Sequence, residues 1–206
     1  MISIVNGTGY GAHRRLLDGM FADRKRLFVD LLGWNVPVVA GRFEVDRFDD
    51  DHATYIIAGD RRTEHDGSLR LLPTERPHIL DTLFAKLCPK GVPSGPDTYE
   101  ITRLCLPTRH TAPDRLRIRN RLISAMVDHA LAVGITTLTG VVAEPFRRQV
   151  LAMGWRADAL GPDQVIDTAH LGAFRIHIDR DTPDRLAATG IYTPGLLAFE
   201  QEGAVA

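Results

Sequence analysis

The residues best suited to chemistry are charged side chains in unusual surroundings. The segment 43–49 holds three acids, Glu44, Asp46 and Asp49, and two phenylalanines. Arg70 interrupts one apolar run, and a second apolar run contains one acid, Glu100, and one arginine, Arg103. An isolated charge taken out of water costs several kcal/mol, so strand charges of this kind must be paired or must meet a ligand. Solvated surface and buried structural ion pairs are the alternatives to a binding site.

Common catalytic signatures are absent from the sequence. It has no GxSxG nucleophile motif, no phosphate-binding GxxxxGK[ST] loop and no dinucleotide-binding glycine fingerprint. The eight histidines are scattered, without a pair at metal-ligand spacing. We therefore expect surface or capping roles for them and no metal site.

Composition narrows the class of protein further. The chain has 206 residues, 44% of them hydrophobic, and a formal net charge of −1, which is typical of a soluble globular protein and lacks the basic excess of a nucleic-acid-binding domain. We expect one domain over residues 1–200 and a flexible tail at 201–206. Cys88 and Cys105 form no disulfide framework, and neither a signal peptide nor an apolar run long enough to cross a membrane is present. A reduced, cytoplasmic setting follows as the expectation.

The elements that must position these residues are predicted from hydrophobic periodicity and turn residues. Residues 14–32 have the spacing of an amphipathic helix that ends at Gly33, and 111–133 predict a long helix between the N-cap Thr111 and Gly134. Shorter helices are expected at 79–87 and 144–153, and strands at 43–46, 55–60, 68–72, 99–106, 136–142, 155–160 and 173–178. The later alternation of strands and helices favours right-handed crossovers between parallel strands. We therefore predict a three-layer α/β sandwich with a mixed sheet, antiparallel early and parallel late.

Nine side chains resemble, in their order and spacing, the signature of the LuxI-type acyl-homoserine-lactone synthases: Arg24, Phe28, Trp34, Asp46, Asp49, Arg70, Phe84, Glu100 and Arg103. They lie in the motifs R-x-x-x-F, G-W, E-x-D-x-x-D, R-L-L-P-T and E-x-x-R. One departure is Thr102-Arg103-Leu104, where the family usually has Ser-Arg-Phe. The resemblance implies a fold similar to that of the GNAT acetyltransferases, which agrees with the predicted sandwich.

The resemblance also implies a reaction. Such enzymes join the acyl group of a thioester to the α-amine of S-adenosylmethionine, close a lactone and release methylthioadenosine. S-adenosylmethionine is then a consumed substrate, and no cofactor is expected. Carboxylates suit its cationic centres, guanidinium groups its carboxylate, and aromatic rings its adenine or sulfonium. The residues implied in binding it are Arg24, Phe28, Trp34, Asp46, Asp49, Arg70 and Phe84.

We assign catalysis to Glu100 and Arg103. An α-ammonium is mostly protonated near pH 7, so acylation needs a general base, and we expect Glu100 to act directly or through a water. Backbone N–H groups around residues 103–105 are candidates to receive the thioester oxyanion. Residues three apart on a regular strand point to opposite faces, so a site shared by Glu100 and Arg103 requires a bulge or a splayed strand.

Two further groups are expected to serve the acyl donor. The acyl pocket is predicted between the late strands and helices, at Ile101, Leu104, Leu122, Met126, Gly140, Val142 and Phe146. Gly140 matches a position where relatives that favour 3-oxo chains often have threonine, so we expect an unsubstituted, branched or bulky acyl group. The predicted dock for an acidic acyl carrier protein, or for the phosphates of coenzyme A, is basic: Arg109, Arg115, Arg117, Arg119, Arg121, Arg147 and Arg148. Core packing and a solvated helix face are the alternative explanations of these two groups.

Two other functions remain open at the level of sequence. A GNAT N-acetyltransferase using acetyl-coenzyme A explains the second half of the chain but not the aromatic and acidic residues between 28 and 49. A non-catalytic sensor of S-adenosylmethionine or of an acyl carrier explains the charges but has no need of Glu100.

Overall fold

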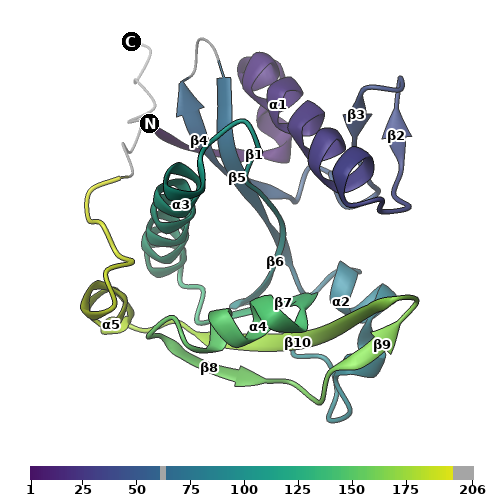
Figure 1. Cartoon of the computed structure of the whole chain (residues 1–206). Helices are drawn as coiled ribbons and strands as arrows, with labels where there is room; N and C mark the ends of the chain where they lie inside the picture. Colours follow the sequence, from purple (N-terminus) through teal and green to yellow (C-terminus); the bar gives the residue numbers. More distant parts are fainter. Residues whose placement is uncertain (61–63, 197–206) are drawn as a thin grey trace.

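An eight-stranded mixed sheet runs through the described residues, 1–60 and 64–196, of the computed structural model (Figure 1). Its strands are β1 (Ile2–Asn6), β4 (Thr54–Asp60), β5 (Glu64–Pro73), β6 (Thr98–Cys105), β7 (Thr137–Ala143), β8 (Arg156–Ala159), β9 (Gln164–Ile166) and β10 (Ala169–His177). They are ordered β1-β4-β5-β6-β7-β10-β8, with β9 paired to β10. A separate hairpin is formed by β2 (Val38–Val39) and β3 (Phe43–Glu44). The predicted tail at 201–206, together with residues 197–200, lies outside the described residues.

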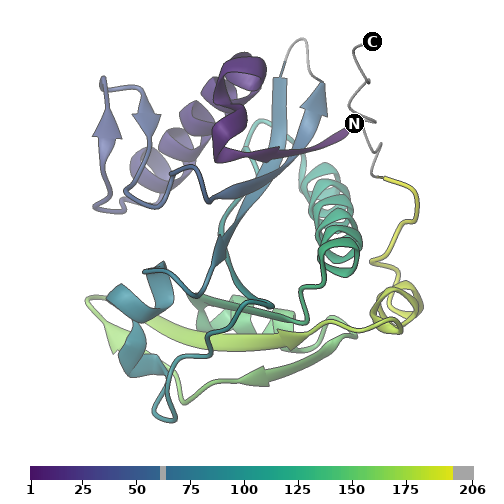
Figure 2. The ribbon, with the colours of Figure 1, turned by 180° about the vertical axis from the view of Figure 1, so that it is seen from behind.

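Helices cover both faces of the sheet and make three layers. They are α1 (Tyr10–Arg24), α2 (Ile79–Leu83), α3 (Ala112–Val133), α4 (Glu144–Leu151) and α5 (Thr182–Ala188). Short 3-10 turns occupy Gly7–Gly9 and Ala85–Leu87. Figures 1 and 2 show α1 and α2 on one side of the sheet and α3 on the other. The core is divided in the same way, because α3 and α4 pack in one hydrophobic cluster and α1 packs in another. The predicted sandwich is confirmed.

The direction of the late strands was predicted only in part. The crossover from β6 through α3 to β7 joins parallel neighbours, as expected. However, β10 lies between β7 and β8 and is antiparallel to both. The parallel strands β7 and β8, joined by α4, are therefore not neighbours. The prediction of a parallel late sheet was wrong because the hairpin-like return of β10 fills the position between them.

The two long predicted helices differ in outcome. For α3 the prediction is confirmed: the Thr111 side chain accepts from the Asp114 N–H, and Gly134 ends the helix at φ 80°. The helix expected at 14–32 instead starts at Tyr10, is α-helical to Arg24 and continues as a π-helix over Lys25–Leu31. The helix ends before Gly33, whose φ of 67° lies in the left-handed region. The wider π turns are common near functional sites.

Several short elements differ from the sequence prediction. The strand expected at 43–46 stops at Glu44 because Asp46 begins a turn: its side chain accepts from the Phe48 N–H and its carbonyl from the Asp49 N–H. Strands β1, β2 and β9 and helix α5 were not predicted. With two and three residues, β2 and β9 are too short to give a periodic signal.

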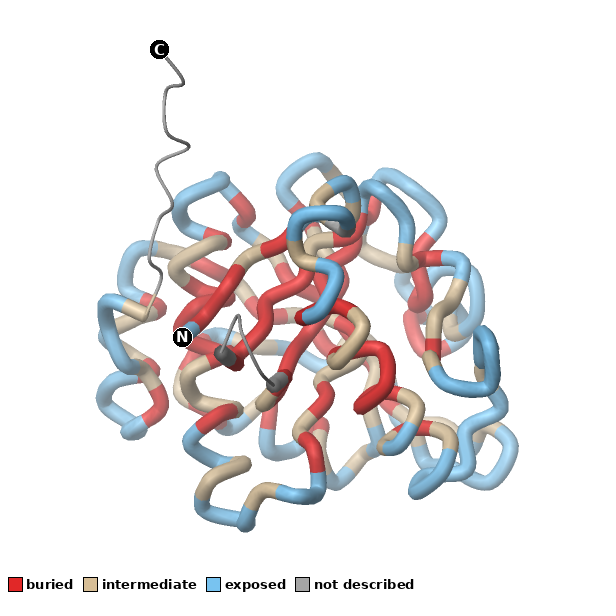
Figure 3. The backbone as a smooth tube through the Cα atoms, turned by 90° about the horizontal axis from the view of Figure 1, so that it is seen from above, coloured by how far each residue is buried: buried red, intermediate tan, exposed pale blue. Residues whose placement is uncertain are grey.

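Burial follows the layers. Figure 3 shows buried positions concentrated along the central strands and exposed positions at loops and outer helix faces. The buried interior contains unusual charged residues, among them Arg24, Arg70 and Glu100, each no more than 1% exposed. Over the described part of the chain, none of the helices combines the length and the apolar character that a membrane crossing needs.

Candidate active site

A network of ion pairs joins the end of α1 to the segment that follows β3. The Arg24 guanidinium donates from Nε to Glu44 Oε2 at 2.6 Å and from Nη1 and Nη2 to the two oxygens of Asp49 at 2.8 and 2.9 Å. Tyr55 on β4 also donates its hydroxyl to Asp49, at 3.0 Å. Burial alone would raise the pKa of Asp49, but Arg24 and Arg70 hold it well below its usual range. Arg24 and Asp49 are therefore both charged and both enclosed.

Arg70 links this network to β6. From β5 it makes a bidentate pair with Asp46, at 2.8 and 3.0 Å, and lies 2.6 Å from Asp49. Its Nε donates to Thr102 Oγ1 on β6 at 2.9 Å. The threonine at the position where the family usually has serine thus supplies the same kind of acceptor, a hydroxyl.

Arg103 reaches the network because β6 is irregular at this point. Pairing with β5 shifts between Ser68 opposite Cys105 and Arg70 opposite Thr102, so β6 has one residue more than β5 there. Arg103 itself has φ 52°, in the left-handed region that a non-glycine residue rarely adopts. It donates to Glu44 at 3.0 Å and to Asp46 at 2.7 Å. The predicted bulge is confirmed, and it turns Arg103 toward the side of β6 that holds Thr102.

The network is neutral and almost closed. Its three arginines and three carboxylates pair with one another, and four of the six side chains are no more than 1% exposed. The two exceptions are Asp46, whose side chain is 8% exposed, and Arg103, at 9%. One carboxylate and one guanidinium are therefore the only parts of the network that a ligand reaches in this arrangement.

An aromatic stack lies beside this accessible edge. The rings of Phe28 and Trp34 stack with centroids 4.6 Å apart and an interplanar angle of 14°. The Arg103 guanidinium lies 5.7 Å from the Phe28 centroid and 5.8 Å from that of Trp34. Trp34 is 44% exposed, so its outer side is open to solvent. Phe84, the residue that ends α2, is half-buried and packs at the edge of two core clusters, and no contact brings it to this stack in the described structure.

Glu100 lies on β6 two residues from Thr102 and therefore about 7 Å along the same face of the strand. It is fully buried. Its Oε2 accepts from the backbone N–H groups of Ile79 and Leu80 at 2.8 and 3.2 Å, whereas Oε1 has no partner among the described residues. Burial raises the pKa of Glu100 to about 7, although the two N–H groups and Arg70 oppose the rise. A carboxyl with this pKa takes up and releases a proton near neutrality, as a general base must.

The predicted acyl-pocket residues lie around the point where β6 and β7 separate. Their parallel pairing ends at Glu100 opposite Thr139. Beyond it, the side chains of Ile101, Leu104, Val142 and Phe146 are half-buried and pack against the cluster that contains the buried Leu122 and Met126. Gly140 is the first residue of β7 past this separation. All seven thus gather on the α3 side of the sheet.

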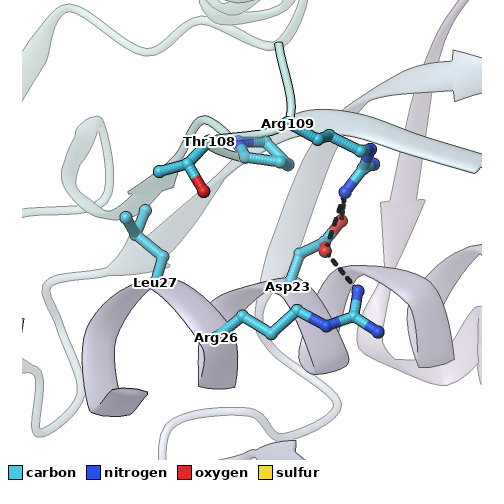
Figure 4. Close-up of a pocket in the computed structure, with 6 residues that line it drawn as sticks. Asp23, Arg26, Leu27, Thr108 and Arg109 are labelled. Carbon is cyan, nitrogen blue, oxygen red and sulfur yellow. Dashed lines mark hydrogen bonds and ion pairs between the residues drawn. The ribbon is translucent and has the colours of Figure 1, made fainter. Parts of the chain in front are cut away.

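The predicted docking arginines do not form one surface. Arg109 pairs with Asp23 at 2.9 Å and donates to the His65 carbonyl, and it lines a pocket of about 140 Å³ with Arg26, Leu27 and Thr108 (Figure 4). His65 and Arg109 together hold the pKa of Asp23 at about 2, although burial opposes them.

Among these arginines, Arg147 is an exception. Only 7% of its side chain is exposed, because it lies over Gly172, pairs with Glu144 at 2.5 Å and donates to the Gly161 carbonyl. A buried side chain cannot meet an incoming carrier, so Arg147 is withdrawn from the predicted dock. The others remain exposed or half-exposed: Arg115, Arg117, Arg119, Arg121 and Arg148.

Sequence reasoning missed some members of the site. Glu44 was noted as one of three acids but was not among the predicted site residues, although it accepts from both Arg24 and Arg103. Its place in the E-x-D-x-x-D motif was a usable signal. Thr102 was noted only as a departure from the family's Ser-Arg-Phe. Tyr55 gave no signal, because a hydroxyl in a strand is common and its partner is set by the fold.

Comparisons with known proteins agree with this geometry. The profile of the family described as autoinducer synthase matches residues 10–186. The chain is 36% identical over 175 residues to an acyl-homoserine-lactone synthase of Ralstonia nicotianae (strain ATCC BAA-1114 / GMI1000), covering 82% of this chain and 83% of that one.

Solved structures give the same result. A CoA-dependent acyl-homoserine lactone synthase, MesI, matches with a TM-score of 0.85 at 23% identity, over 97% of this chain and all of that one. BjaI, a second such enzyme, solved with SAM and isopentyl-CoA, matches with a TM-score of 0.84 at 25% identity, over 95% of this chain and 91% of that one. The predicted fold class, a GNAT-like sandwich, is thereby confirmed.

Proposed function

Because the chain belongs to the autoinducer synthase family, we propose that its polar site binds S-adenosylmethionine, acylates its α-amine and closes the lactone. The family also decides between the functions that the sequence left open: the protein is an acyl-homoserine-lactone synthase rather than a GNAT N-acetyltransferase or a non-catalytic sensor. The observation that carries the proposed mechanism is Glu100, a buried carboxyl with a pKa near 7 beside a neutral, preformed ion network. BjaI has been solved with SAM and isopentyl-CoA and with MTA, which supports the same kinds of substrate and the same product here.

Recognition of S-adenosylmethionine uses the accessible edge of the network. The amino-acid end of this substrate has an ammonium and a carboxylate, which pair with Asp46 and Arg103 respectively. Trp34 and Phe28 offer a π face to the sulfonium or the adenine. Arg24, Asp49 and Arg70 are enclosed, so their role is to fix the positions of the two residues that touch the substrate.

Acylation then proceeds through Glu100. Its carboxylate accepts a proton from the α-ammonium, and the neutral amine attacks the thioester carbonyl carbon. The tetrahedral intermediate carries an oxyanion, for which the backbone N–H groups at the Arg103 bulge are the candidates. Collapse breaks the carbon–sulfur bond, and the thiolate leaves with the second proton of the nitrogen. Glu100 returns its proton to solvent when the product departs.

Lactone formation asks less of the protein. The carboxylate oxygen of the acylated intermediate attacks its own γ-carbon, and the carbon–sulfur bond breaks with its electron pair on sulfur. The sulfonium thereby becomes neutral methylthioadenosine, a good leaving group. Positioning within one molecule supplies much of the rate, and Arg103 holds the carboxylate until it attacks.

The test is product analysis with purified protein, S-adenosylmethionine and a panel of acyl thioesters on coenzyme A and on acyl carrier protein. We expect lactone and methylthioadenosine in equal amounts, detected by mass spectrometry. Acylated product without methylthioadenosine would contradict the lactone step, and binding without product would contradict catalysis. Comparison of the two donor series identifies the carrier.

A further inference from the structure

The separation of β6 from β7 opens a fork in the sheet at the catalytic base. Thr98, Tyr99 and Glu100 are the residues of β6 that pair with β7, opposite 137–139. Past this point β7 stays paired with β10 as far as Ala143, whereas β6 turns away through the Arg103 bulge. Glu100 thus stands at the apex of the fork, on the side of α2, and the half-buried apolar residues lie beyond it on the side of α3.

One aromatic ring comes close to this apex from β10, the strand that pairs with β7. Phe174 on β10 is directly opposite Gly140 on β7. A Cβ atom placed on Gly140 would lie 2.6 Å from Phe174 Cζ and 3.1 Å from the Ile101 carbonyl oxygen. Real Cβ atoms do not approach so closely, so the ring of Phe174 uses the space that the absence of a side chain at 140 leaves. The tip of the ring therefore lies against the backbone of Gly140, on the strand that borders the fork.

The apolar residues around the fork differ in depth. Ile101, Leu104, Val142 and Phe146 are half-buried, as residues at the mouth of a pocket are. Phe174 is 3% exposed, and Leu122 and Met126 on α3, in the same cluster, are no more exposed than that. An acyl chain whose carbonyl is held at Glu100 enters past the half-buried residues and meets the Phe174 ring before it reaches α3.

We propose that Phe174 forms the floor of the acyl pocket and restricts this enzyme to short or branched acyl thioesters. The inference rests on the proposed function, because it assumes that the acyl carbonyl is held at the fork. A phenyl ring that is 3% exposed and fills the space beside Gly140 cannot move aside without opening a gap in a close-packed core. The floor is therefore rigid, and chains that extend past it are rejected by volume rather than by charge.

The test compares chain-length profiles of three proteins. Lactone formation is measured as kcat/KM with straight-chain acyl thioesters of increasing length, for the wild type, Phe174→Leu and Ile176→Val. Ile176 is the matched control, because it is buried on the same strand two residues further on and pairs with Leu138, before the fork. We expect Phe174→Leu to shift the ratio of long to short chains by about 10-fold or more per accommodated methylene and Ile176→Val to leave it unchanged.

Several outcomes decide the matter. A folded Phe174→Leu protein with the wild-type profile, or an equal shift in the Ile176→Val control, overturns the assignment. If Phe174→Leu does not fold, Phe174→Met replaces it, since methionine has nearly the same volume but bends aside.

Gly140→Ala gives the opposite test: the added methyl should lower activity with every chain, and Phe174→Leu in the same protein should restore it. Failure of the wild type to make lactone from any thioester would instead contradict the proposed function.

Discussion

The two faces of β6 differ in the side chains that surround them. On the side of α1 and α2, Glu100 and Thr102 adjoin a network of buried charges whose positions are fixed by bidentate pairs. On the side of α3, Ile101 and Leu104 adjoin an apolar cluster. One strand supplies both because its side chains alternate, and the bulge at Arg103 breaks the alternation where the polar site needs a further cation.

The difference between the charged and the apolar face indicates where the protein tolerates substitutions. Removing one partner of a buried ion pair leaves an uncompensated charge and costs about 3–5 kcal/mol. A volume-conserving swap among buried apolar residues usually costs less than about 1.5 kcal/mol. We therefore expect the polar face to fix the substrate that the reaction cannot replace, and the apolar face to be the place where acyl preference changes at lower cost.

The largest effect is expected on the polar face, for Glu100→Gln. Loss of the base should lower kcat by about 100- to 10,000-fold at pH 7, with KM for S-adenosylmethionine changed little. The variant should fold, because the raised pKa of Glu100 means that its charge destabilises the folded state as pH rises from 4.5 through about 7. Thermal unfolding well above pH 7 should show the variant at least as stable as the wild type. Wild-type turnover in Glu100→Gln would remove this residue as the base.

A buried charge on the same face should be almost as costly to remove, in stability rather than in rate. Arg24→Met leaves Arg103 as the cation beside Glu44 and Arg70 as the cation beside Asp49, so the buried network has one carboxylate in excess. The free energy of unfolding should fall by about 3–5 kcal/mol. Arg26→Met is the matched control, since that side chain is 69% exposed and the buried Asp23 keeps His65 and Arg109 as partners. It should change stability by about 1 kcal/mol or less. Denaturant unfolding measures both. An equal loss of unfolding free energy in both variants would mean that the buried network contributes no more to stability than an exposed ion pair.

The pH dependence of turnover distinguishes the polar face from the apolar one. A protonated Glu100 cannot accept the ammonium proton, so kcat should fall about tenfold per pH unit below an apparent pKa near 7. Phe174→Leu should keep this profile, because it alters volume and not charge. A shift of the midpoint by that variant would show that the two faces are coupled electrostatically.

The smallest effect is expected at the surface of α3. Arg115→Gln combined with Arg121→Gln should raise KM several-fold for an acyl carrier protein donor, with a weaker salt dependence, because steering by exposed charge is long-ranged and screened. The same change should affect a coenzyme A donor less. Arg14→Gln is the control, an exposed arginine on α1 at the other face of the sheet. An equal effect of the control would contradict docking at α3.

What the sequence could predict depends on the range of the interactions. Helix α3 was predicted closely because Thr111 and Gly134 act within a few residues of each end. The bulge was predicted because two charges three residues apart had to share one face. The insertion of β10 between β7 and β8 was not, because pairing partners of late strands are decided by contacts distant in sequence.

The site shows the same limit. Residue types and spacing indicated Arg24, Asp46, Asp49, Arg70 and Arg103, but not that they pair mainly with one another and leave only Asp46 and Arg103 accessible. Arg147 looked like surface charge. It is buried because Gly172 on β10 has no side chain and the guanidinium occupies that space, a contact that no local pattern reveals.

The most direct test of the account measures KM for S-adenosylmethionine and the acyl chain-length profile on the same two variants. Asp46→Asn should raise that KM and leave the chain-length profile of the wild type, whereas Phe174→Leu should shift the profile toward longer chains and leave the KM. If the two faces of β6 act independently, each variant changes only one of the two quantities. If both variants change both the KM and the chain-length profile, the account is contradicted.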